Sequence, residues 1–374
     1  MKVLIAGDFC PQYRVAELFD NGSYDSVLGA VKPYTEQADY SIVNFECPVT
    51  LGIEGETPIV KIGPSLCCSR KGVDAIKWAG FDCVTLANNH FYDYGENGVK
   101  QTVSACIDEG IDIVGGGINI ERASAVLYKN IEGKTLAIIN CCEHEFSIAT
   151  DTKGGSNPLN PVQQYYAIQG ARKKANYVLV IVHGGHEMFQ LPSLRMQETY
   201  RFFVDAGADA VVNHHQHCYS GYEVYQGKPI IYGLGNFCFD EKGSTGGIWN
   251  EGYLLILSFD ESCSFKIIPY NQCDKEPSVV LLPEGSFDVK LNEFNAIIQK
   301  KELLVEHVNR YYDSCNKQSS YIFEPLMNRV YTSLRYRNIM PSMVSDKRKI
   351  LAFDFISCES HRDRIIRYLS DYNN

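Results

Sequence analysis

Short apolar runs alternate with longer amphipathic segments through the first third of the chain. A mostly apolar run of four to seven residues is typical of a strand buried on both faces of a parallel sheet. The runs expected to be strands are 3–6, 40–45, 81–87 and 111–114. Helical patterns cover 26–38, 71–80 and 95–110. This alternation of strand and helix predicts an α/β layer architecture.

The same pattern continues to about residue 270 with fewer helices. Strands are expected at 135–142, 177–182 and from 210, with helices at 162–175 and 192–206 between them. Three further strands, at 230–234, 253–259 and 265–268, have no helix between them, which favours antiparallel pairing. From about 274 the pattern is helical, over 287–309, 321–336 and 346–369. We therefore expect mixed β-sheets flanked by helices over 1–273 and a helical C-terminal extension over 274–374.

Composition narrows the class of protein. The 45 acidic and 35 basic residues give a net charge of −10, and no basic stripe is seen, which argues against a nucleic-acid partner. Several of the 14 cysteines lie inside apolar runs, where reduced thiols behave as small hydrophobes. The opening apolar run ends at Asp8, unlike a signal peptide, and no run approaches the roughly 20 apolar residues of a membrane helix. We therefore expect a cytoplasmic protein with no membrane span.

Residues of the types that commonly bind metals come directly after several of the apolar runs. They are Asp8, Glu46, Asn89 with His90, His183, and His215 with His217. Ligands bind outside the carboxyl ends of the strands in an open α/β sheet, so we expect these side chains to meet at one edge. Carboxylate, amide and imidazole ligands together suit Mn, Fe or Zn, and two ions sharing a carboxylate would use this many donors. Taken alone, the histidines near 215 are equally compatible with a surface cluster, and each of the six positions taken singly is compatible with a cap or a turn.

These residues lie within ordered motifs that resemble the CapA family. The motifs are Gly7-Asp8, Val43-Asn44-Phe45-Glu46, Ala87-Asn88-Asn89-His90 with Asp93, His183-Gly184-Gly185-His186-Glu187, His214-His215-Gln216-His217 and Leu234-Gly235-Asn236-Phe237. That family is linked to poly-gamma-glutamate capsule synthesis and is similar to the calcineurin-like metallophosphoesterases. The resemblance spans about residues 1–270 and implies a layered metallophosphoesterase-like fold. It leaves the C-terminal extension unexplained.

The resemblance also implies a role for each ligand. It places Asp8 and His217 on one metal, Asn89, His183 and His215 on the other, and Glu46 between them. His90 would then donate a proton to the leaving group, and Asp93 would orient its imidazole.

The first motif departs from the wider phosphoesterase pattern. It reads Asp8-Phe9-Cys10, whereas that group has Asp-x-His, so one imidazole is missing. Cys10 is either a replacement thiolate or, in our preferred interpretation, a buried thiol. Glu46 stands where the wider group has aspartate, which adds a methylene and bears on the metal spacing.

Four further residues are candidates for substrate binding. His186 and Glu187 follow a metal ligand and either line the pocket or form a solvated turn. Asn236 either hydrogen-bonds a ligand loop or makes a turn. Lys61 lies in a long loop where it would meet an anionic substrate, although a solvated lysine is the simpler interpretation.

These residues together favour a metal-dependent hydrolase. Its substrate would be a phosphoester or an amide-linked anionic polymer, or a precursor, in capsule or exopolymer biosynthesis. The alternative is a non-catalytic polymer-binding subunit of a capsule assembly or export complex, which would bind a capsule-biosynthesis partner through its C-terminal helices. A nuclease, the third possibility, is disfavoured by the acidic composition.

Overall fold

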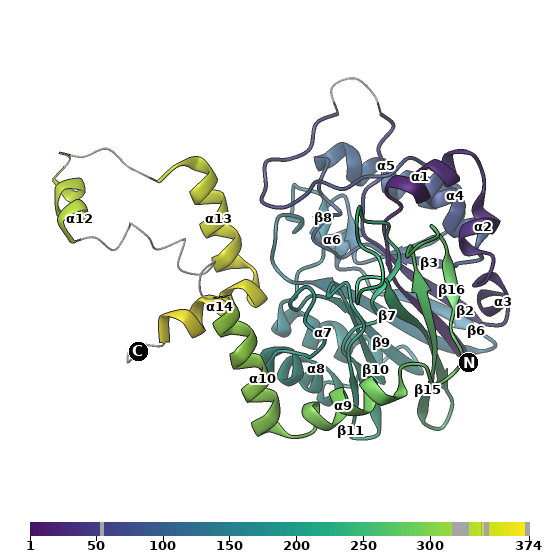
Figure 1. Cartoon of the computed structure of the whole chain (residues 1–374). Helices are drawn as coiled ribbons and strands as arrows, with labels where there is room; N and C mark the ends of the chain where they lie inside the picture. The colour runs from purple at the N-terminus through teal and green to yellow at the C-terminus, as the bar shows by residue number, and fades with distance from the viewer. Residues whose placement is uncertain (53–55, 316–328, 338, 340–343, 371–374) are drawn as a thin grey trace.

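Two mixed β-sheets face each other at the centre of the molecule (Figure 1). The computed structural model describes residues 1–52, 56–315, 329–337, 339 and 344–370. The first sheet has the order β16-β15-β14-β1-β2-β3-β4, and β13 also pairs with the end of β1. Its strands are β1 (Lys2–Phe9), β2 (Tyr40–Phe45), β3 (Cys83–Thr85), β4 (Asp112–Val114), β13 (Asn236–Cys238), β14 (Glu251–Phe259), β15 (Cys263–Gln272) and β16 (Val279–Leu281).

The second sheet has the order β11-β12-β10-β9-β7-β6. Its four inner strands are parallel, and the two edge strands are antiparallel to their neighbours. The strands are β6 (Leu127–Ile131), β7 (Lys134–Cys142), β9 (Tyr177–His183), β10 (Ala210–His214), β11 (Tyr222–Tyr225) and β12 (Lys228–Ile231); β5 (Gly116–Gly117) and β8 (Gly155–Ser156) form a separate small ladder.

Side-chain alternation along β1 explains why this strand has no polar face. Val3 and Ile5 enter the core between the two sheets, where Ile181 of β9 also lies. Leu4 and Ala6 point the other way, into the core beneath the helices of the first sheet. Both faces of the strand are therefore buried, as the apolar run predicts.

Helices cover the outer faces of both sheets. Those on the first sheet are α1 (Tyr13–Asp20), α2 (Tyr24–Leu28), α3 (Lys32–Thr35), α4 (Lys71–Trp78) and α5 (Gly95–Asp108), and α6 (Ile120–Ala123) lies beside the small ladder. The second sheet is covered by α7 (Pro161–Arg172) and α8 (Leu194–Asp205). Ser193 caps α8 by accepting a hydrogen bond from the Met196 amide, which fixes where that helix begins. The expected layered α/β architecture is confirmed.

The C-terminal helices are α9 (Asp288–Ile298), α10 (Lys301–Ser314), α12 (Arg329–Tyr336), α13 (Asp346–Ser357) and α14 (Glu359–Ser370). Of these, α9 and α10 pack beside the second sheet, whereas α12 stands away from it (Figure 1). Leu304 and Val308 of α10 are fully buried against the sheet, and α14 packs on α10. Residues 321–328 of the helix expected over 321–336 lie outside the described residues. β16 extends the first sheet past residue 273, and the proposed domain boundary stays a prediction.

Several local expectations differ from the structure, and the helices expected over 287–309 and 346–369 are each divided into two. Antiparallel pairing was favoured for the strand at 230–234, and β12 pairs antiparallel with β11 but parallel with β10. The reason is β11, an unexpected strand that reverses the chain through a hairpin before β12. The helix over 26–38 is two short helices, α2 and α3, and α1 was not expected. Antiparallel pairing of β14 with β15 is confirmed.

In the described part of the chain, every helix is too short or too polar to cross a bilayer.

Candidate metal centre

The predicted ligands converge where the parallel strands of both sheets end. Asp8 lies near the end of β1, and Glu46 directly follows β2. His183 ends β9, and the loop after β10 carries His215 and His217. All five side chains are buried. The sequence predicted one sheet edge, whereas the structure uses the adjoining edges of two facing sheets.

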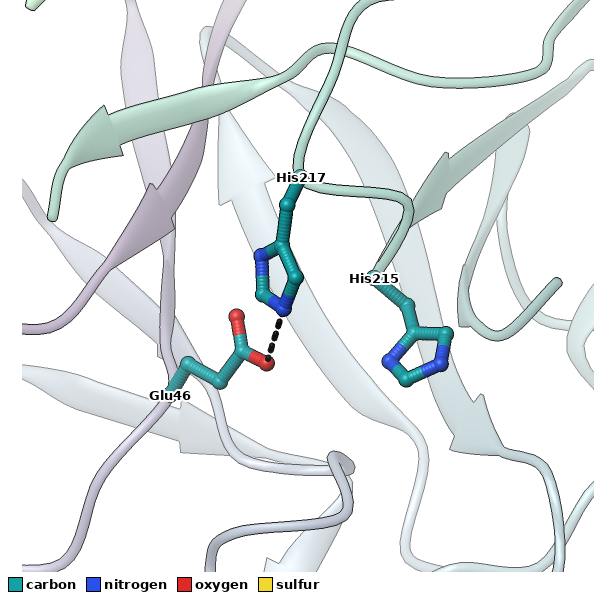
Figure 2. A group of neighbouring side chains, drawn as sticks. All are labelled: Glu46, His215 and His217. Atoms are coloured by element: carbon teal, nitrogen blue, oxygen red, sulfur yellow. Dashed lines mark ion pairs between the residues drawn. The ribbon is translucent and has the colours of Figure 1, made fainter. Parts of the chain in front are cut away.

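Glu46 occupies the middle of this cluster. Its Oε1 lies 3.4 Å from His183 Nε2 and 3.7 Å from His217 Nε2. Figure 2 shows the His217 ring directed at the Glu46 carboxylate, with His215 beside it. Two sets of donor atoms each lie within 4.8 Å of one another: Glu46 with His215 and His217, and Asp8 with Glu46 and His183. Because Glu46 belongs to both sets, it has the position of a shared ligand.

Asn89 joins the cluster through His183. The Asn89 Oδ1 lies 3.1 Å from His183 Nε2, which in turn lies 3.1 Å from His215 Nδ1. On the other side, Asp8 Oδ2 lies 3.5 Å from His217 Nδ1. These contacts group the residues as the family resemblance implies, while the two sets around Glu46 divide them differently. The assignment of each residue to a particular ion stays a prediction.

The Glu46 carboxylate has the environment that a bound cation would satisfy. Both of its oxygens are buried, and neither has a hydrogen-bond partner among the described residues. Burial and the nearby Asp8 raise the pKa of Glu46 well above its usual value. A buried carboxylate whose oxygens lack hydrogen-bond donors is costly, so the residues present fit a divalent metal.

The imidazoles around Glu46 supply suitable ligand atoms. Burial lowers the pKa of His215 to about 4 and holds that of His183 well below its usual value. Both rings are therefore neutral at physiological pH and keep a lone pair for a metal. Burial also acts on His217, but the carboxylates of Glu46 and Asp8 outweigh it and raise its pKa to about 10. A proton on His217 thus supplies positive charge that a metal would otherwise bring.

The backbone at the histidine loop is strained. His215 has φ of +90° and His217 has φ of +54°, a region that residues with a Cβ seldom adopt. Such strain persists only where the surrounding structure holds it and is concentrated at functional sites. It turns two imidazoles that are two residues apart toward the same group of carboxylates.

Buried amides hold the ligands in place. Asn236 is fully buried, and its Oδ1 lies 3.0 Å from His217 Nδ1, which leaves Nε2 facing Glu46. The Asn44 side chain donates to Asp8 Oδ1 over 2.8 Å. Such contacts fix the ring and carboxylate orientations that metals require. Contact between Asn236 and a substrate stays a prediction, but the structure gives its side chain a partner already.

His90, Asp93 and Lys61 form a buried group beside the cluster. The His90 Nδ1 lies 2.7 Å from Asp93 Oδ2, as expected for an oriented imidazole. Lys61 pairs with Asp93 and its Nζ lies 3.1 Å from His90 Nδ1. Burial, opposed by Asp93 and aided by Lys61, lowers the pKa of His90. The Lys61 side chain is only 4% exposed, so its partner in this structure is Asp93, and its role toward an anionic substrate stays a prediction.

The remaining candidates lie at the edges of the cluster. His186 is buried, and its Nε2 lies 3.2 Å from the Tyr312 hydroxyl. Glu187 is exposed to a neighbouring cavity. Burial raises the pKa of the Cys10 thiol to about 11, which favours the buried-thiol interpretation over a thiolate ligand.

Some residues near the site were missed from the sequence. Asn44 lies within the Val43-Asn44-Phe45-Glu46 motif, but no function was expected for its side chain. His361 and Arg364 were not expected at the site, yet both line the cavity next to His215. Their spacing of three residues on one helix was the signal that places them on the same face.

The fold and site together define a layered α/β protein with a buried cluster of carboxylates and imidazoles at the strand ends that is compatible with metal binding. The family model for bacterial capsule synthesis protein PGA_cap matches residues 2–241. The chain belongs to this family of bacterial capsule synthesis proteins, which confirms the resemblance.

Individual relatives agree with this assignment. The chain is 35% identical over 247 residues to the capsule biosynthesis protein CapA of Bacillus anthracis, covering 64% of this chain and 60% of that protein. It is 33% identical over 245 residues to the PGA biosynthesis protein CapA of Bacillus subtilis, covering 64% of each. The matches thus span less than two thirds of these relatives. A putative 5'-nucleotidase from Staphylococcus aureus superposes with a TM-score of 0.44 at 15% identity, covering 78% of this chain and 57% of that one, a likeness too weak to support further argument.

Proposed function

We propose that this protein is a metal-dependent hydrolase that acts in capsule or exopolymer biosynthesis on a phosphoester or an amide-linked anionic polymer or precursor. The observation that carries the proposal is the buried Glu46 carboxylate, which has no hydrogen-bond partner among the described residues and is shared by two sets of donor atoms. Family membership supports the biological setting. Two Mn, Fe or Zn ions are the proposed cofactors.

The proposed chemistry needs few groups beyond the metal ligands. Divalent ions at such a centre supply activation of water and neutralisation of charge on the scissile group. His90 would move the proton: its Nδ1 contacts Asp93, which supports Nε2 as the ring nitrogen for the transfer. Asp93 holds the ring, and Lys61 balances the charge of Asp93. No side-chain nucleophile is required.

Replacing Glu46 with Gln tests the proposal with two readouts. In wild-type protein purified without chelator, elemental analysis should find bound metal, and a panel of phosphoester and amide substrates should include one that is hydrolysed. Glu46→Gln should lose metal and hydrolysis. The same variant should be about as stable as wild type after metal removal, because an amide of similar size replaces a buried carboxyl group whose oxygens have no hydrogen-bond partner among the described residues. Full metal content in Glu46→Gln, or a well-metallated wild type that hydrolyses nothing on the panel, would contradict the proposal.

A non-catalytic, polymer-binding role is the second candidate. Large apolar side chains are exposed on the C-terminal helices, including Phe353 and Ile356 of α13 and Ile366 of α14, and such surfaces suit partner proteins. This candidate expects metallated protein to retain polymer without cleaving it and to bind a capsule-assembly protein. Phe353→Ser with Ile356→Ser should abolish that complex and leave polymer retention unchanged; an intact complex would argue against it.

A further inference from the structure

The Asn89 amide is held between the metal cluster and the loop that follows β7. Its Oδ1 lies 3.1 Å from His183 Nε2, and its Nδ2 donates to Glu145 Oε2 over 3.4 Å. Only the nitrogen end of an amide can donate to a carboxylate oxygen, so Glu145 fixes which end of the Asn89 side chain faces the cluster. Turned the other way, Asn89 would present N–H groups to the cluster, and these have no lone pair for a cation.

A second contact from the same loop holds the backbone of residue 89. Ser147 is 1% exposed, and its hydroxyl donates to the Asn89 carbonyl oxygen over 2.5 Å. The same hydroxyl accepts from the Tyr92 amide over 3.2 Å. Residues 143–147, which we call the 143–147 loop, therefore hold both the side chain and the main chain of this proposed ligand.

The C-terminal helix α14 binds the 143–147 loop directly. Glu359, the first residue of α14, accepts from the His144 backbone amide over 2.9 Å, and its other carboxylate oxygen lies 2.7 Å from His144 Nδ1. The next amide of the helix, that of Ser360, donates to Glu143 over 3.0 Å. Hydrogen bonds to a carboxylate are the stronger kind. Because Glu143 and His144 directly precede Glu145, α14 fixes the backbone that carries Glu145.

We propose that α14 positions a metal ligand: through the 143–147 loop it holds Glu145 against the Asn89 amide and keeps Asn89 Oδ1 directed at the metal ions. Glu145 is then a positioning residue that acts through Asn89. The family model ends at residue 241, so it covers Asn89 and Glu145 but not the helix that holds them. As a statement about a proposed metal ligand, this inference rests on the proposed function.

Titration of the metal-free full chain with Co²⁺ tests the role of Glu145. Co²⁺ accepts the same nitrogen and oxygen ligands as the proposed ions, and its visible absorption changes with the ligand set. Glu145→Leu removes the acceptor and lets the Asn89 amide turn, so it should weaken Co²⁺ binding about 10- to 100-fold. Glu145→Gln keeps an accepting oxygen at the same reach and should stay within about fivefold of wild type. Equal losses in the two variants, or wild-type binding by Glu145→Leu, would overturn the proposal.

The substitution Asn89→Asp separates orientation from a general structural role. A carboxylate has two equivalent oxygens and needs no partner to choose between its ends. In the Asn89→Asp background, Glu145→Leu should therefore leave Co²⁺ binding no weaker than in Asn89→Asp alone. A role of Glu145 in packing would weaken binding in both backgrounds alike, and that result would refute the proposal. Thermal unfolding of each metal-free variant shows that it is folded.

A variant in α14 tests whether the helix acts through Glu145. Glu359→Ala removes both contacts with His144 and should weaken Co²⁺ binding at least about threefold. The double variant Glu145→Leu, Glu359→Ala should bind as weakly as Glu145→Leu alone, because both changes act on the same amide. Arg367→Gln is the matched control and should leave binding unchanged, since Arg367 lies on α14 but pairs with Asp313 of α10 at 3.0 Å. Additive losses, or wild-type binding by Glu359→Ala, would refute the role of α14.

These measurements do not depend on hydrolysis. A protein that needs Glu145 to bind Co²⁺ but hydrolyses no substrate keeps this inference and loses the proposed function. A protein that hydrolyses a substrate while Glu145→Leu binds Co²⁺ like wild type keeps the function and loses this inference. A wild-type chain that binds neither Co²⁺ nor Zn²⁺ would overturn both.

Discussion

Replacing Glu143 with Gln should loosen the C-terminal helices from the core. Glu143 follows β7, is 4% exposed, and accepts hydrogen bonds from two different elements. Arg195 Nη2 of α8 donates over 2.8 Å, and the Ser360 amide of α14 donates over 3.0 Å. The carboxylate therefore joins the extension to the second sheet. Arg195 also pairs with Asp363 of α14 at 2.9 Å, so it keeps one partner in the variant.

The size of the effect follows from the pKa of Glu143. Burial alone would raise this pKa, but Arg195 and the Ser360 amide outweigh it and lower it from 4.5 to about 2. A depression of this size corresponds to roughly 3 kcal/mol of folding free energy at neutral pH. Because the folded pKa is the lower one, this contribution is present above about pH 4.5 and is lost as pH falls toward about 2. With Asp363 still on Arg195, we expect Glu143→Gln to lose about 2–3 kcal/mol at pH 7.

Urea unfolding at pH 7 and pH 3 measures this difference. The loss should be large at pH 7 and clearly smaller at pH 3. Glu306→Gln is the control: Glu306 pairs with Arg310 at 2.7 Å, but the two side chains are 59% and 68% exposed, so the change should stay below about 0.5 kcal/mol. Limited proteolysis at pH 7 should cut the Glu143 variant first between α13 and α14. Equal losses at both pH values would refute the reasoning.

Three further predictions concern the site and the core. Asn236→Leu removes the group next to His217 Nδ1 and should lower metal affinity about 10- to 100-fold in a chelator competition; unchanged affinity would show that the amide does not orient the ring. Tyr200→Phe removes the 2.7 Å hydrogen bond to Asn213 Oδ1 and should cost about 1–3 kcal/mol in thermal unfolding, with a smaller loss pointing to a water replacing the hydroxyl. Ile181→Ala opens a cavity in the fully buried core between the sheets and should cost about 2–5 kcal/mol by urea titration; a loss below 1 kcal/mol would mean that the sheets close over the gap.

The clustering of candidate ligands was predictable because it depends on local patterns. β1 is buried on both faces, so a carboxylate such as Asp8 near its end is costly to bury. Its presence there therefore indicates a functional role at the end of the strand. The same holds for Glu46 after β2 and His183 at the end of β9. Parallel strands end on the same side of a sheet, so a list of strand-end residues already approximates a site.

The sharing of that site by two sheets was not predictable from these patterns. Apolar runs specify burial, but they do not specify which strands pair. β11 was missed because Tyr222, Glu223 and Val224 alternate only weakly, and without it the parallel pairing of β12 with β10 has no visible cause. Strand pairing depends on contacts between distant segments, and periodicity within one segment carries no information about them.

The C-terminal extension shows the same limit and gives it a functional meaning. Helical periodicity predicted the segment containing α13 and α14, but nothing in it indicated that Arg364 would reach the cavity beside His215 or that Ser360 would bind Glu143, more than 200 residues earlier. The family model ends at residue 241, so it covers every proposed metal ligand and none of the α14 residues. Two members of the family that share the proposed metal ligands can therefore differ in the C-terminal residues that line the cavity beside those ligands. If the proposed roles hold, family membership predicts the chemistry, while the lining of that cavity must be determined from the C-terminal helices of each chain.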